Sequence, residues 1–351
     1  MQPYIIDQLH PDEFGINRKL DRDAFEPRLL AHVLSKLLGT AIVRADYETT
    51  QLYGGTLGDV RLVSGKAVTS DENELPYKVV VKTQKRWERP GDPNSWRREY
   101  DLYTSDLAKS FTGQLRWPEC YHAELNGDVI QIWMEYIDGV SGGGLTIETL
   151  EQAARELGRF QGRLSKQSES MPGITCLGDT GYMRRDFAQW TPETVEYRYL
   201  HSDECGLPEH LRQMLKDTQR RAEAIFSNTG RLPIVLCHRD FWIENIFLSD
   251  ESIILIDWDT AGWGYLGEDI ASLIADETDA QRLPEYYRRL VPAYLSGISE
   301  YMDISEIDDF FIREMIIIKF GYRLLQQYMF SQSPDEKNQV VIALQNISEM
   351  V

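Results

Sequence analysis

Residues 232–262 constrain the fold most, because they place charged and polar side chains inside an apolar run, LPIVLCHRDFWIENIFLSDESIILIDWDTAG. Within this run, Asn245 follows Asp240 by five residues, and Asp257 follows Asn245 by twelve. A buried charge is costly unless it is paired or binds a ligand. We therefore expect these three polar side chains to converge on one site, held in place by the apolar residues between them.

The residue types also indicate the chemistry of this site. A carboxylate and a carboxamide on one loop, joined by a second carboxylate, offer the oxygen ligands that Mg²⁺ prefers together with substrate phosphates. The order His238-Arg239-Asp240, then Asn245, then Asp257 is that of the catalytic loop and metal-binding Asp of protein kinases. Asp and Asn are also common in turns. The prediction therefore depends on residues further upstream.

Three upstream features occur in the order that nucleotide binding requires. Residues 55–60, GTLGDV, match the last part of a G-x-G-x-x-G-x-V phosphate loop, with Tyr53 in place of its first glycine. Lys82 ends an apolar run, as the lysine of a V-A-I-K strand does, and Glu99 on the next predicted helix can pair with it. Each feature taken singly has an ordinary explanation: the glycine loop as a plain hairpin turn, and Lys82 and Glu99 as surface residues. Their combined order favours a nucleotide site.

The first part of the chain has the pattern of an antiparallel sheet. Strands are predicted at 42–53, 58–68, 75–84, 118–126 and 128–137, and helices at 27–39 and 95–111. The dipeptide Asn126-Gly127 between the last two strands is a strong hairpin signal. The pattern predicts a five-stranded antiparallel unit over residues 42–137, with one helix inserted after its third strand.

The rest of the chain is predicted to be mainly helical. It begins with DGVSGGG at 138–144, which is typical of a flexible linker. Helices are predicted at 146–167, 192–202, 208–227, 268–277, 284–298 and 305–349, with short strands near 246–248 and 253–257. Thr146 is the expected cap of the first helix. We expect two domains: a nucleotide-binding lobe at 1–137, with a helical extension in 1–40, and a helical lobe at 138–351 with the catalytic loop and the substrate site.

Composition excludes several classes of protein. The 351 residues carry a formal net charge of −19, which argues against a nucleic-acid partner because phosphates would be repelled. No apolar run approaches the roughly 18 residues of a membrane span, and the N-terminus lacks the pattern of a signal peptide. We therefore expect a cytoplasmic protein with no membrane partner. The 4 cysteines are scattered without a C-x-x-C pair, which favours reduced thiols. The oligomeric state stays open.

Together the motifs resemble those of the aminoglycoside phosphotransferase and choline kinase family, the small-molecule branch of the protein-kinase-like fold. The resemblance runs from about residue 50 to 275 and is most specific in CHRDFWIENIFL and ILIDWDTAGWGYLGEDIASL. Asp-Trp-Asp at 257–259 and Asp-Ile-Ala at 269–271 are similar to the family's I-D-W-[DE] and D-[IL]-A ending, and differ from the D-F-G and A-P-E of protein kinases. A protein substrate is therefore not expected.

The resemblance implies an α+β, bilobal protein-kinase-like fold, with a small N-lobe built on a five-stranded antiparallel sheet and one helix, and a larger, mainly helical C-lobe. It implies that Asp240 accepts or orients the proton of a substrate hydroxyl, that Asn245 and Asp257 bind Mg²⁺, and that the nucleotide is ATP or GTP. The implied nucleotide-site residues are Gly55, Gly58, Val60, Val80, Lys82, Glu99, Glu135, Tyr136, Ile137, Phe247 and Ile256.

Within this set the resemblance implies distinct tasks. Lys82 would contact the α- and β-phosphates, with Glu99 holding it in place. Residues 135–137 would form the hinge that binds adenine through backbone groups. The remaining apolar residues would enclose the adenine ring, although apolar residues at strand spacing are more often ordinary core residues: Val60, Val80, Phe247 and Ile256.

Three neighbours of these residues have other expected tasks. His238 is expected to anchor the loop by hydrogen bonds rather than to act as an acid or base. Asp269, near a helix start, is expected to accept hydrogen bonds from backbone N–H groups of the catalytic loop. Arg239 departs from the family, which usually has Gly at this position, and the sequence assigns it no partner.

The acceptor is expected on the helices between 168 and 230, near 262–279 and against the C-terminal helices. Acidic and aromatic residues there suit a cationic acceptor such as an aminoglycoside-type antibiotic or an amino alcohol. They are Glu193, Glu196, Asp203, Glu204, Glu268, Asp276, Glu277, Asp279, Trp190, Trp258 and Trp263. Most such carboxylates face water and most such tryptophans are core, so a neutral sugar, nucleoside or macrolide stays open. A kinase-like nucleotide-binding protein without catalysis is the alternative from another class.

Overall fold

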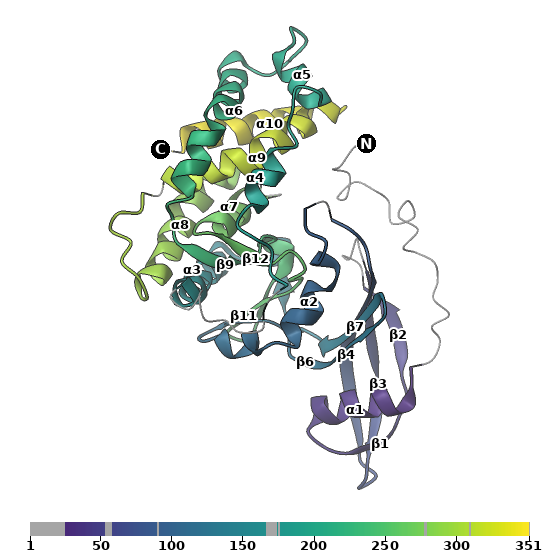
Figure 1. Cartoon of the computed structure of the whole chain (residues 1–351). Coiled ribbons are helices and arrows are strands. Elements are labelled where there is room, and N and C mark those ends of the chain that lie inside the picture. Colours follow the sequence, from purple (N-terminus) through teal and green to yellow (C-terminus); the bar gives the residue numbers. More distant parts are fainter. Residues whose placement is uncertain are drawn as a thin grey trace. The chain divides into compact units, whose positions relative to one another are not determined.

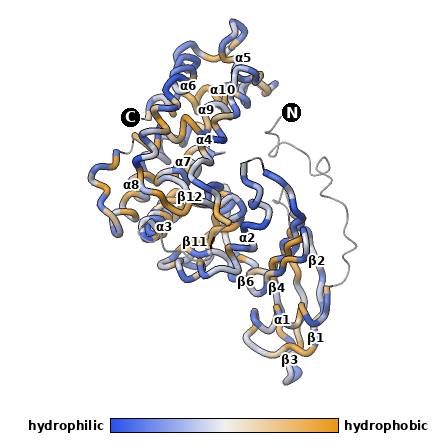
Figure 2. Tube along the Cα trace, in the orientation of Figure 1, coloured by the Kyte–Doolittle hydropathy of each residue, from blue (hydrophilic) through white to orange (hydrophobic). Residues whose placement is uncertain are grey.

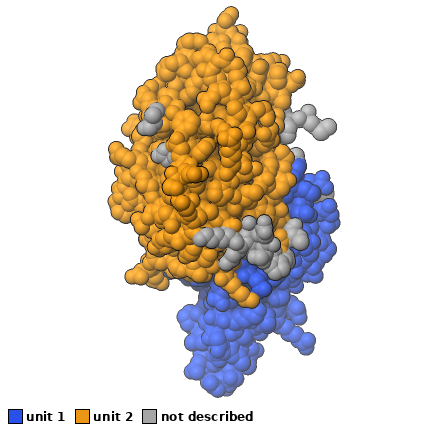
Figure 3. Space-filling model, turned by 60° about the vertical axis from the view of Figure 1, so that its left-hand side comes forward, with its two compact units in different colours: residues 1–108, 117–138 blue, residues 109–116, 139–351 orange. Residues whose placement is uncertain are grey.

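The computed structural model describes residues 25–52, 58–89, 91–165, 174, 176–276, 279–308 and 310–350. Figure 1 shows the course of the chain, and Figure 3 shows its two compact units, one of residues 1–108 with 117–138 and one of residues 109–116 with 139–351. Among the described helices, none is both long enough and apolar enough to cross a membrane. The described cysteines are all free thiols.

The first unit is built on an antiparallel sheet in the order β1-β3-β4-β7-β6, with β2 also paired to β3. Its elements are α1 (Pro27–Leu38), β1 (Ile42–Ala45), β2 (Glu48–Gln51), β3 (Asp59–Thr69), β4 (Glu74–Lys85), α2 (Ser95–Tyr103), β6 (Cys120–Asn126) and β7 (Val129–Glu135). Because β1 and β2 occupy the same edge of β3, the sheet has five positions, and α2 follows the third predicted strand. The predicted five-stranded sheet with one inserted helix is confirmed.

Two predicted elements of this unit are interrupted. The predicted strand 42–53 breaks at Asp46, whose Oδ1 accepts the Lys66 N–H at 2.6 Å and whose carbonyl accepts the Tyr77 hydroxyl at 2.8 Å. The predicted helix 95–111 ends as an α-helix at Tyr103 and continues as a 3-10 turn from Asp106 to Ser110. The hydroxyl of Ser105 causes this break, because it bonds the carbonyl of Leu102 and the N–H of Leu107 in place of helical partners.

Hydrophobic residues cover both faces of this sheet. Figure 2 shows them recurring along β1, β3 and β4. One face packs against α1, whose buried residues Leu30, Val33 and Leu34 follow helical spacing, and Trp133 of β7 is fully buried in that cluster. The other face packs around Trp96 of α2 and buried side chains of β7. Each face therefore removes a large aromatic side chain from water, a contribution of about 2 to 3 kcal/mol.

The second unit is mainly helical, and short strands carry the predicted catalytic loop. Its helices are α3 (Ile147–Ser165), α4 (Tyr182–Phe187), α5 (Val195–His201), α6 (Glu209–Thr229), α7 (Glu268–Ala275), α8 (Leu283–Ser299), α9 (Phe310–Phe330) and α10 (Pro334–Glu349). Its strands are β5 (Leu115–Arg116), β8 (Val140–Ser141), β9 (Ile234–Cys237), β10 (Ile246–Ser249), β11 (Ser252–Leu255) and β12 (Gly262–Tyr265). They form one sheet in the order β5-β11-β10-β8 and a two-stranded sheet of β12 and β9.

The structure corrects two predictions here. The predicted helix 305–349 is two helices, because Ser333 accepts the Glu336 N–H as an N-cap and Pro334 begins α10. The predicted flexible linker 138–144 is ordered by pairing of β8 with β10, and Gly142 adopts the left-handed region at φ +58°. Thr146 caps α3 as predicted, since its hydroxyl accepts the Thr149 N–H at 3.3 Å.

The crossing of α3 and α8 brings two backbones into close approach. A Cβ added to Gly158 would lie 2.2 Å from the carbonyl oxygen of Tyr294, and one added to Gly297 would lie 2.1 Å from that of Arg155. These distances are far below normal contact, so both positions need glycine. The close approach places α3 firmly enough for its side chains to support the catalytic loop.

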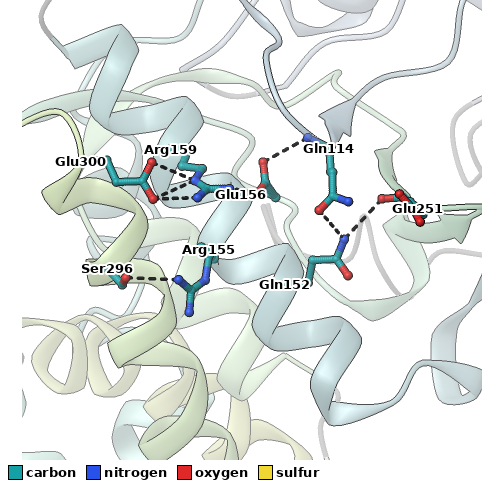
Figure 4. A network of polar contacts seen from close by, with 8 residues as sticks. All are labelled: Gln114, Gln152, Arg155, Glu156, Arg159, Glu251, Ser296 and Glu300. Carbon is teal, nitrogen blue, oxygen red and sulfur yellow. Dashed lines mark hydrogen bonds and ion pairs between the residues drawn. The ribbon is translucent and has the colours of Figure 1, made fainter.

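Polar contacts fasten α3 further, as Figure 4 shows. Arg159 Nη2 lies 2.8 Å from the carboxylate of Glu300, and Arg159 Nη1 lies 2.5 Å from that of Glu156. On the adjoining side, Gln152 donates to the side chain of Gln114 at 2.8 Å and to the carbonyl of Glu251 at 3.3 Å. The helix is thus joined to α8 and to the segments that flank β5 and β11.

Candidate active site

The predicted catalytic loop begins where β9 ends. Val235, Leu236 and Cys237 of β9 are fully buried, and β9 pairs with β12 from Ile234 to Cys237. A fully apolar strand of four residues places the next residues, 238–240, at a fixed point on the edge of the core. The sequence prediction lacks β9 and β12, so their pairing is a feature that only the structure provides.

Asp240 and Asn245 lie in direct contact. The Nδ2 of Asn245 donates to the carbonyl of Asp240 at 2.9 Å and to its Oδ2 at 2.8 Å. Asn245 is 7% exposed and ends the 3-10 turn Ile243–Asn245. Because the amide nitrogen is committed to Asp240, the amide oxygen faces the other way and is the atom that can bind a cation.

Asp257 stands close enough to Asp240 for the two carboxylates to repel each other. Burial, followed by the charges of Asp257 and then Asp276, raises the pKa of Asp240 to about 6. Asp257 follows β11 in the left-handed region, at φ +64°. That conformation is uncommon for a residue with a side chain and is often found at functional sites. The structure thus brings the predicted catalytic and metal-binding residues of this unit together.

His238 anchors the loop, as expected. Its Nε2 donates to the carbonyl of Ile256 at 2.9 Å, and its Nδ1 accepts the N–H of Asp240 at 3.3 Å. The ring is 1% exposed and lies 4.6 Å from the ring of Trp258. Burial lowers the pKa of His238 to about 4, so the ring is neutral at physiological pH and acts as a structural link.

Asp269 accepts hydrogen bonds from the catalytic loop, which confirms the expectation for this residue. Its Oδ2 accepts the N–H of His238 at 2.8 Å, and its Oδ1 accepts the N–H of Arg239 at 2.7 Å. Gln161 of α3 donates to the same carboxylate at 2.8 Å and to the carbonyl of Leu236 at 3.1 Å. Burial raises the pKa of the fully buried Asp269, and the two backbone donors oppose that rise.

Sequence reasoning missed Lys319 and Gln161, which support the loop from behind. Lys319 of α9 is 8% exposed, and its ammonium lies 3.4 Å from the carbonyl oxygen of Arg239 and bonds the hydroxyl of Ser272. The signal for Lys319 was present, since a lysine inside the run MIIIKF at 315–320 needs a buried partner. Gln161 gave no such signal, because a glutamine on an amphipathic helix is ordinary.

The predicted nucleotide residues of the first unit include one close ion pair. Lys82 Nζ lies 2.6 Å from a carboxylate oxygen of Glu99, with side chains 12% and 2% exposed. A Cβ on Gly58 would lie 3.3 Å from the carbonyl of Thr83 and 3.9 Å from Cε of Lys82, so the end of the glycine loop packs directly on this strand. Gly55 and Tyr53 lie outside the described residues.

The four residues predicted to enclose adenine are not fully buried within their own units. Val60, Val80, Phe247 and Ile256 are each partly exposed. Their strand neighbours Val79, Ile246 and Leu255 are fully buried. None of the four is a fully buried core residue, which leaves their surfaces able to contact a ligand.

The predicted hinge residues are also partly exposed. The N–H of Glu135 already donates to the carbonyl of Glu119 at 2.9 Å, so this N–H is not available to an adenine. The ring of Tyr136 lies 4.9 Å from the ammonium of Lys78.

The residues suggested for acceptor binding divide into core and surface positions. Trp258 is fully buried, and Trp190 is 7% exposed and stacks on Tyr322 with ring centres 5.2 Å apart. Both are core residues, whereas Trp263 is partly exposed. Glu196 is buried and accepts a hydrogen bond from the side chain of Gln326, and Glu268 is buried and accepts one from the N–H of Tyr265. Glu193, Asp203, Glu204 and Asp279 are exposed, and Glu277 lies outside the described residues. Asp276 is the member of this set whose charge reaches Asp240.

The donor set at Asn245 and Asp257 fits a magnesium ion. Mg²⁺ needs only one or two protein oxygens when phosphates and water complete its shell. The committed amide nitrogen of Asn245 leaves such an oxygen, and Asp257 supplies a carboxylate. Elsewhere, the described part of the chain contains no cluster of three or more His, Cys, Asp or Glu residues that could hold a metal. This is the donor chemistry of a phosphate-bound cation rather than of zinc.

A strand-based unit with a paired lysine and glutamate, and a helical unit with a catalytic loop, define a protein-kinase-like fold. The sequence model of the phosphotransferase enzyme family matches residues 85–304, which is more than half of the chain. The chain therefore belongs to the phosphotransferase enzyme family, and it is a small-molecule kinase. The predicted resemblance and fold class are confirmed. No curated protein matches the sequence.

Solved structures of small-molecule kinases share this fold. A choline kinase from Cryptosporidium parvum Iowa II is 15% identical, with 87% of this chain and 90% of that chain covered and a TM-score of 0.53. An aminoglycoside phosphotransferase from Alicyclobacillus acidocaldarius is 14% identical, with coverage of 94% and 95% and a TM-score of 0.52. A microcompartment-associated aminopropanol kinase is 14% identical, with coverage of 91% and 95% and a TM-score of 0.50. At these identities the likeness concerns the fold.

Proposed function

We propose that this enzyme transfers the γ-phosphoryl group of Mg-ATP to a hydroxyl of a small cationic molecule. The observation that carries the proposal is the contact between Asp240 and Asn245, with hydrogen bonds of 2.8 and 2.9 Å beside the carboxylate of Asp257. In this arrangement the carboxylate of Asp240 would align the hydroxyl, and the amide oxygen of Asn245 and the carboxylate of Asp257 would bind the cation.

Asp240 is suited to align the acceptor hydroxyl. Its pKa of about 6 lies near physiological pH, where a carboxylate is both ionised and able to take a proton. In the proposed step the acceptor oxygen forms a bond to the γ-phosphorus, the bond to the β,γ-bridging oxygen breaks, ADP leaves and the hydroxyl proton passes to Asp240. Positioning of the hydroxyl supplies most of the rate enhancement in such transfers.

The metal and the nucleotide would use the other predicted residues. Asn245 and Asp257 would hold Mg²⁺, which neutralises phosphate charge when it is bound. Lys82, held by Glu99 at 2.6 Å, would bind the α- and β-phosphates, and Gly58 would let the loop approach them. The adenine ring would be contacted by the side chains of Val60, Val80, Phe247 and Ile256. Its edge would form hydrogen bonds with backbone groups of Glu135, Tyr136 and Ile137. GTP could occupy the same site in place of ATP.

The charge near Asp240 favours a cationic acceptor. Asp240, Asp257 and Asp276 are close enough for each of the last two to raise the pKa of the first. A cation placed beside these three carboxylates would be attracted, whereas a neutral acceptor would gain nothing from them. An amino alcohol or an aminoglycoside-type antibiotic has both the hydroxyl and the positive charge.

A matched acceptor panel tests this proposal. Purified enzyme with Mg-ATP would be assayed by mass spectrometry for phosphorylated products of aminoglycosides, choline, its uncharged isostere 3,3-dimethylbutanol, sugars, nucleosides and macrolides. We expect a product with a cationic acceptor and at least about tenfold lower kcat/KM with its neutral isostere, which corresponds to about 1.4 kcal/mol. Products from neutral acceptors alone would reverse the charge assignment. ATP binding without any product would favour a non-catalytic nucleotide-binding protein.

A further inference from the structure

Arg239 precedes the proposed catalytic residue, and the phosphoryl-transfer step leaves its side chain without a task. Its Nη2 donates to the carbonyl of Asp179 at 2.5 Å and to the carbonyl of Trp263 at 2.6 Å. Its guanidinium carbon lies 4.6 Å from the centre of the Tyr182 ring. The residue is only 4% exposed. One buried guanidinium thus contacts two segments outside the catalytic loop.

The backbone of Arg239 is held as firmly as its side chain. Its N–H donates to Asp269 at 2.7 Å, and its carbonyl lies 3.4 Å from the ammonium of Lys319. Its φ of +71° is in the left-handed region, where glycine fits without strain and arginine does not. The contacts of the backbone and of the side chain together offset this unfavourable conformation.

The guanidinium fills a closed slot rather than facing a ligand. A Cβ added to Gly262 would lie 2.4 Å from Nη1, so β12 needs a glycine where the guanidinium passes. Nε and Nη1 are buried without a hydrogen-bond partner. The buried carboxylates of Glu268 and Asp269 balance the charge electrostatically, since Arg239 lowers the pKa of each. The contacts of Arg239 therefore serve to hold protein segments together.

The segment that Arg239 holds leads to the predicted acceptor-binding helices. Gly178 forms a parallel bridge with Gly262. The N–H of Trp263 donates to the carbonyl of Gly178 at 2.8 Å, and the N–H of Gly178 donates to the carbonyl of Ala261 at 3.3 Å. Helix α4 begins at Tyr182, directly beyond this bridge. Among the described residues, two backbone hydrogen bonds join Gly178 to Ala261 and to Trp263 of β12, so the hydrogen bonds of the guanidinium are a major part of the attachment of this segment.

We infer that Arg239 is a positioning residue that holds the 178–182 segment against the catalytic loop and thereby aligns the acceptor side of the site with Asp240. The effect on catalysis rests on the proposed function, whereas the attachment of the segment does not. Because the guanidinium is buried among protein groups, we assign Arg239 no contact with the acceptor or with the reacting atoms. Its influence on turnover passes through the segment and through the backbone that leads into Asp240.

Substitution with glycine separates the side chain from the backbone. Arg239→Gly removes every guanidinium contact and accepts the φ of +71°, whereas Arg239→Ala removes the same contacts and keeps the strain. Arg239→Lys keeps the charge but lacks the planar guanidinium, which lies over the Tyr182 ring and whose Nη2 donates to both carbonyls. Arg155→Ala is a control, because the side chain of Arg155 is exposed and its one hydrogen bond within the described part of the chain is to the Ser296 hydroxyl, at 3.4 Å.

Hydrogen exchange measures the attachment without any acceptor. In Arg239→Gly we expect peptides covering 176–187 and 258–266 to exchange at least about tenfold faster than in the wild type, with β3 and β4 unchanged. Arg239→Lys should fall between the two, and Arg155→Ala should match the wild type. Arg239→Ala should have a lower Tm than Arg239→Gly. Wild-type exchange of both peptides in Arg239→Gly would overturn the inference, whether or not an acceptor is known.

Steady-state kinetics with an acceptor found by the panel measures the alignment. We expect Arg239→Gly to lose about 10- to 100-fold in kcat/KM for the acceptor, while KM for ATP changes less than about twofold. A variant with fast exchange and unchanged acceptor kinetics would refute the alignment, and a variant that loses ATP binding equally would show a general loss of folding. Absence of transfer by the wild type would count against the proposed function and leave the exchange result standing.

Discussion

Replacement of Asp269 by asparagine tests how the catalytic loop is held. The carboxylate accepts three hydrogen bonds, from the N–H of His238 at 2.8 Å, from the N–H of Arg239 at 2.7 Å and from Gln161 at 2.8 Å. An asparagine has one acceptor oxygen and one NH₂ group. In either orientation it loses at least one of these bonds and turns a donor toward a backbone N–H.

The expected loss in the free energy of unfolding follows from these hydrogen bonds. A hydrogen bond to a charged group contributes about 1.5 to 3 kcal/mol, and a buried N–H without a partner costs about 1 to 3 kcal/mol. Asparagine also removes the cost of burying a carboxylate, a cost seen in the raised pKa of Asp269. The net loss should therefore be about 2 to 4 kcal/mol. For a unit of this size that corresponds to a fall in Tm of roughly 4 to 16 °C.

Thermal unfolding followed by tryptophan fluorescence measures this loss. Asp303→Asn is the matched control, because Asp303 is exposed and its carboxylate accepts the N–H of Ser305 at 2.9 Å. The control should change Tm by no more than about 1 °C. If Asp269→Asn unfolds at the same temperature as the control, the three hydrogen bonds do not stabilise the loop and the reasoning is wrong.

Two further predictions concern packing and pH. Gly158→Ala places a Cβ 2.2 Å from a carbonyl oxygen of α8 and should lower the free energy of unfolding by about 1 to 3 kcal/mol, measured by thermal unfolding. The control Gly143→Ala, whose Cβ would meet nothing within 4 Å, should change it by no more than about 0.5 kcal/mol. Equal Tm values for the two variants would contradict the close crossing of α3 and α8. The pKa of His238 is lowered from 6.5 to about 4 in the folded protein, so the ring of the unfolded chain binds a proton at a higher pH than the folded ring does. The contribution of His238 to stability is therefore complete above pH 6.5 and is lost as the pH falls toward about 4, by up to about 3 kcal/mol. His238→Asn should lack this part of the decline, and parallel pH profiles of Tm for variant and wild type would contradict it.

Local patterns were sufficient for much of the fold. The amphipathic spacing in α1 and the capping residue Thr146 both predict helix starts that the structure confirms. The two interrupted helices show the limit of periodicity. At Ser105 and Ser333 a single hydroxyl competes with helical hydrogen bonds, and this competition is local chemistry that an apolar repeat does not report.

The candidate site was predictable where it depends on motif residues and unpredictable where it depends on backbone groups. The contact between Lys82 and Glu99 follows from the cost of burying an ammonium, and the structure shows it. The partners of Arg239 are two carbonyl oxygens, which every residue possesses, so no sequence pattern marks them. The short strands β9 and β12 escape detection for a related reason, because four residues are too few for a clear period.

Phosphotransfer by Asp240→Asn tests the central claim most directly. The substitution keeps the shape of the side chain and removes its ability to take a proton, with turnover measured on the best acceptor of the panel and Mg-ATP binding measured by calorimetry. We predict that kcat falls by about 10²- to 10⁴-fold, while the Kd for Mg-ATP changes less than about threefold. A variant that turns over within about threefold of the wild type would contradict the assignment of Asp240 as the catalytic residue.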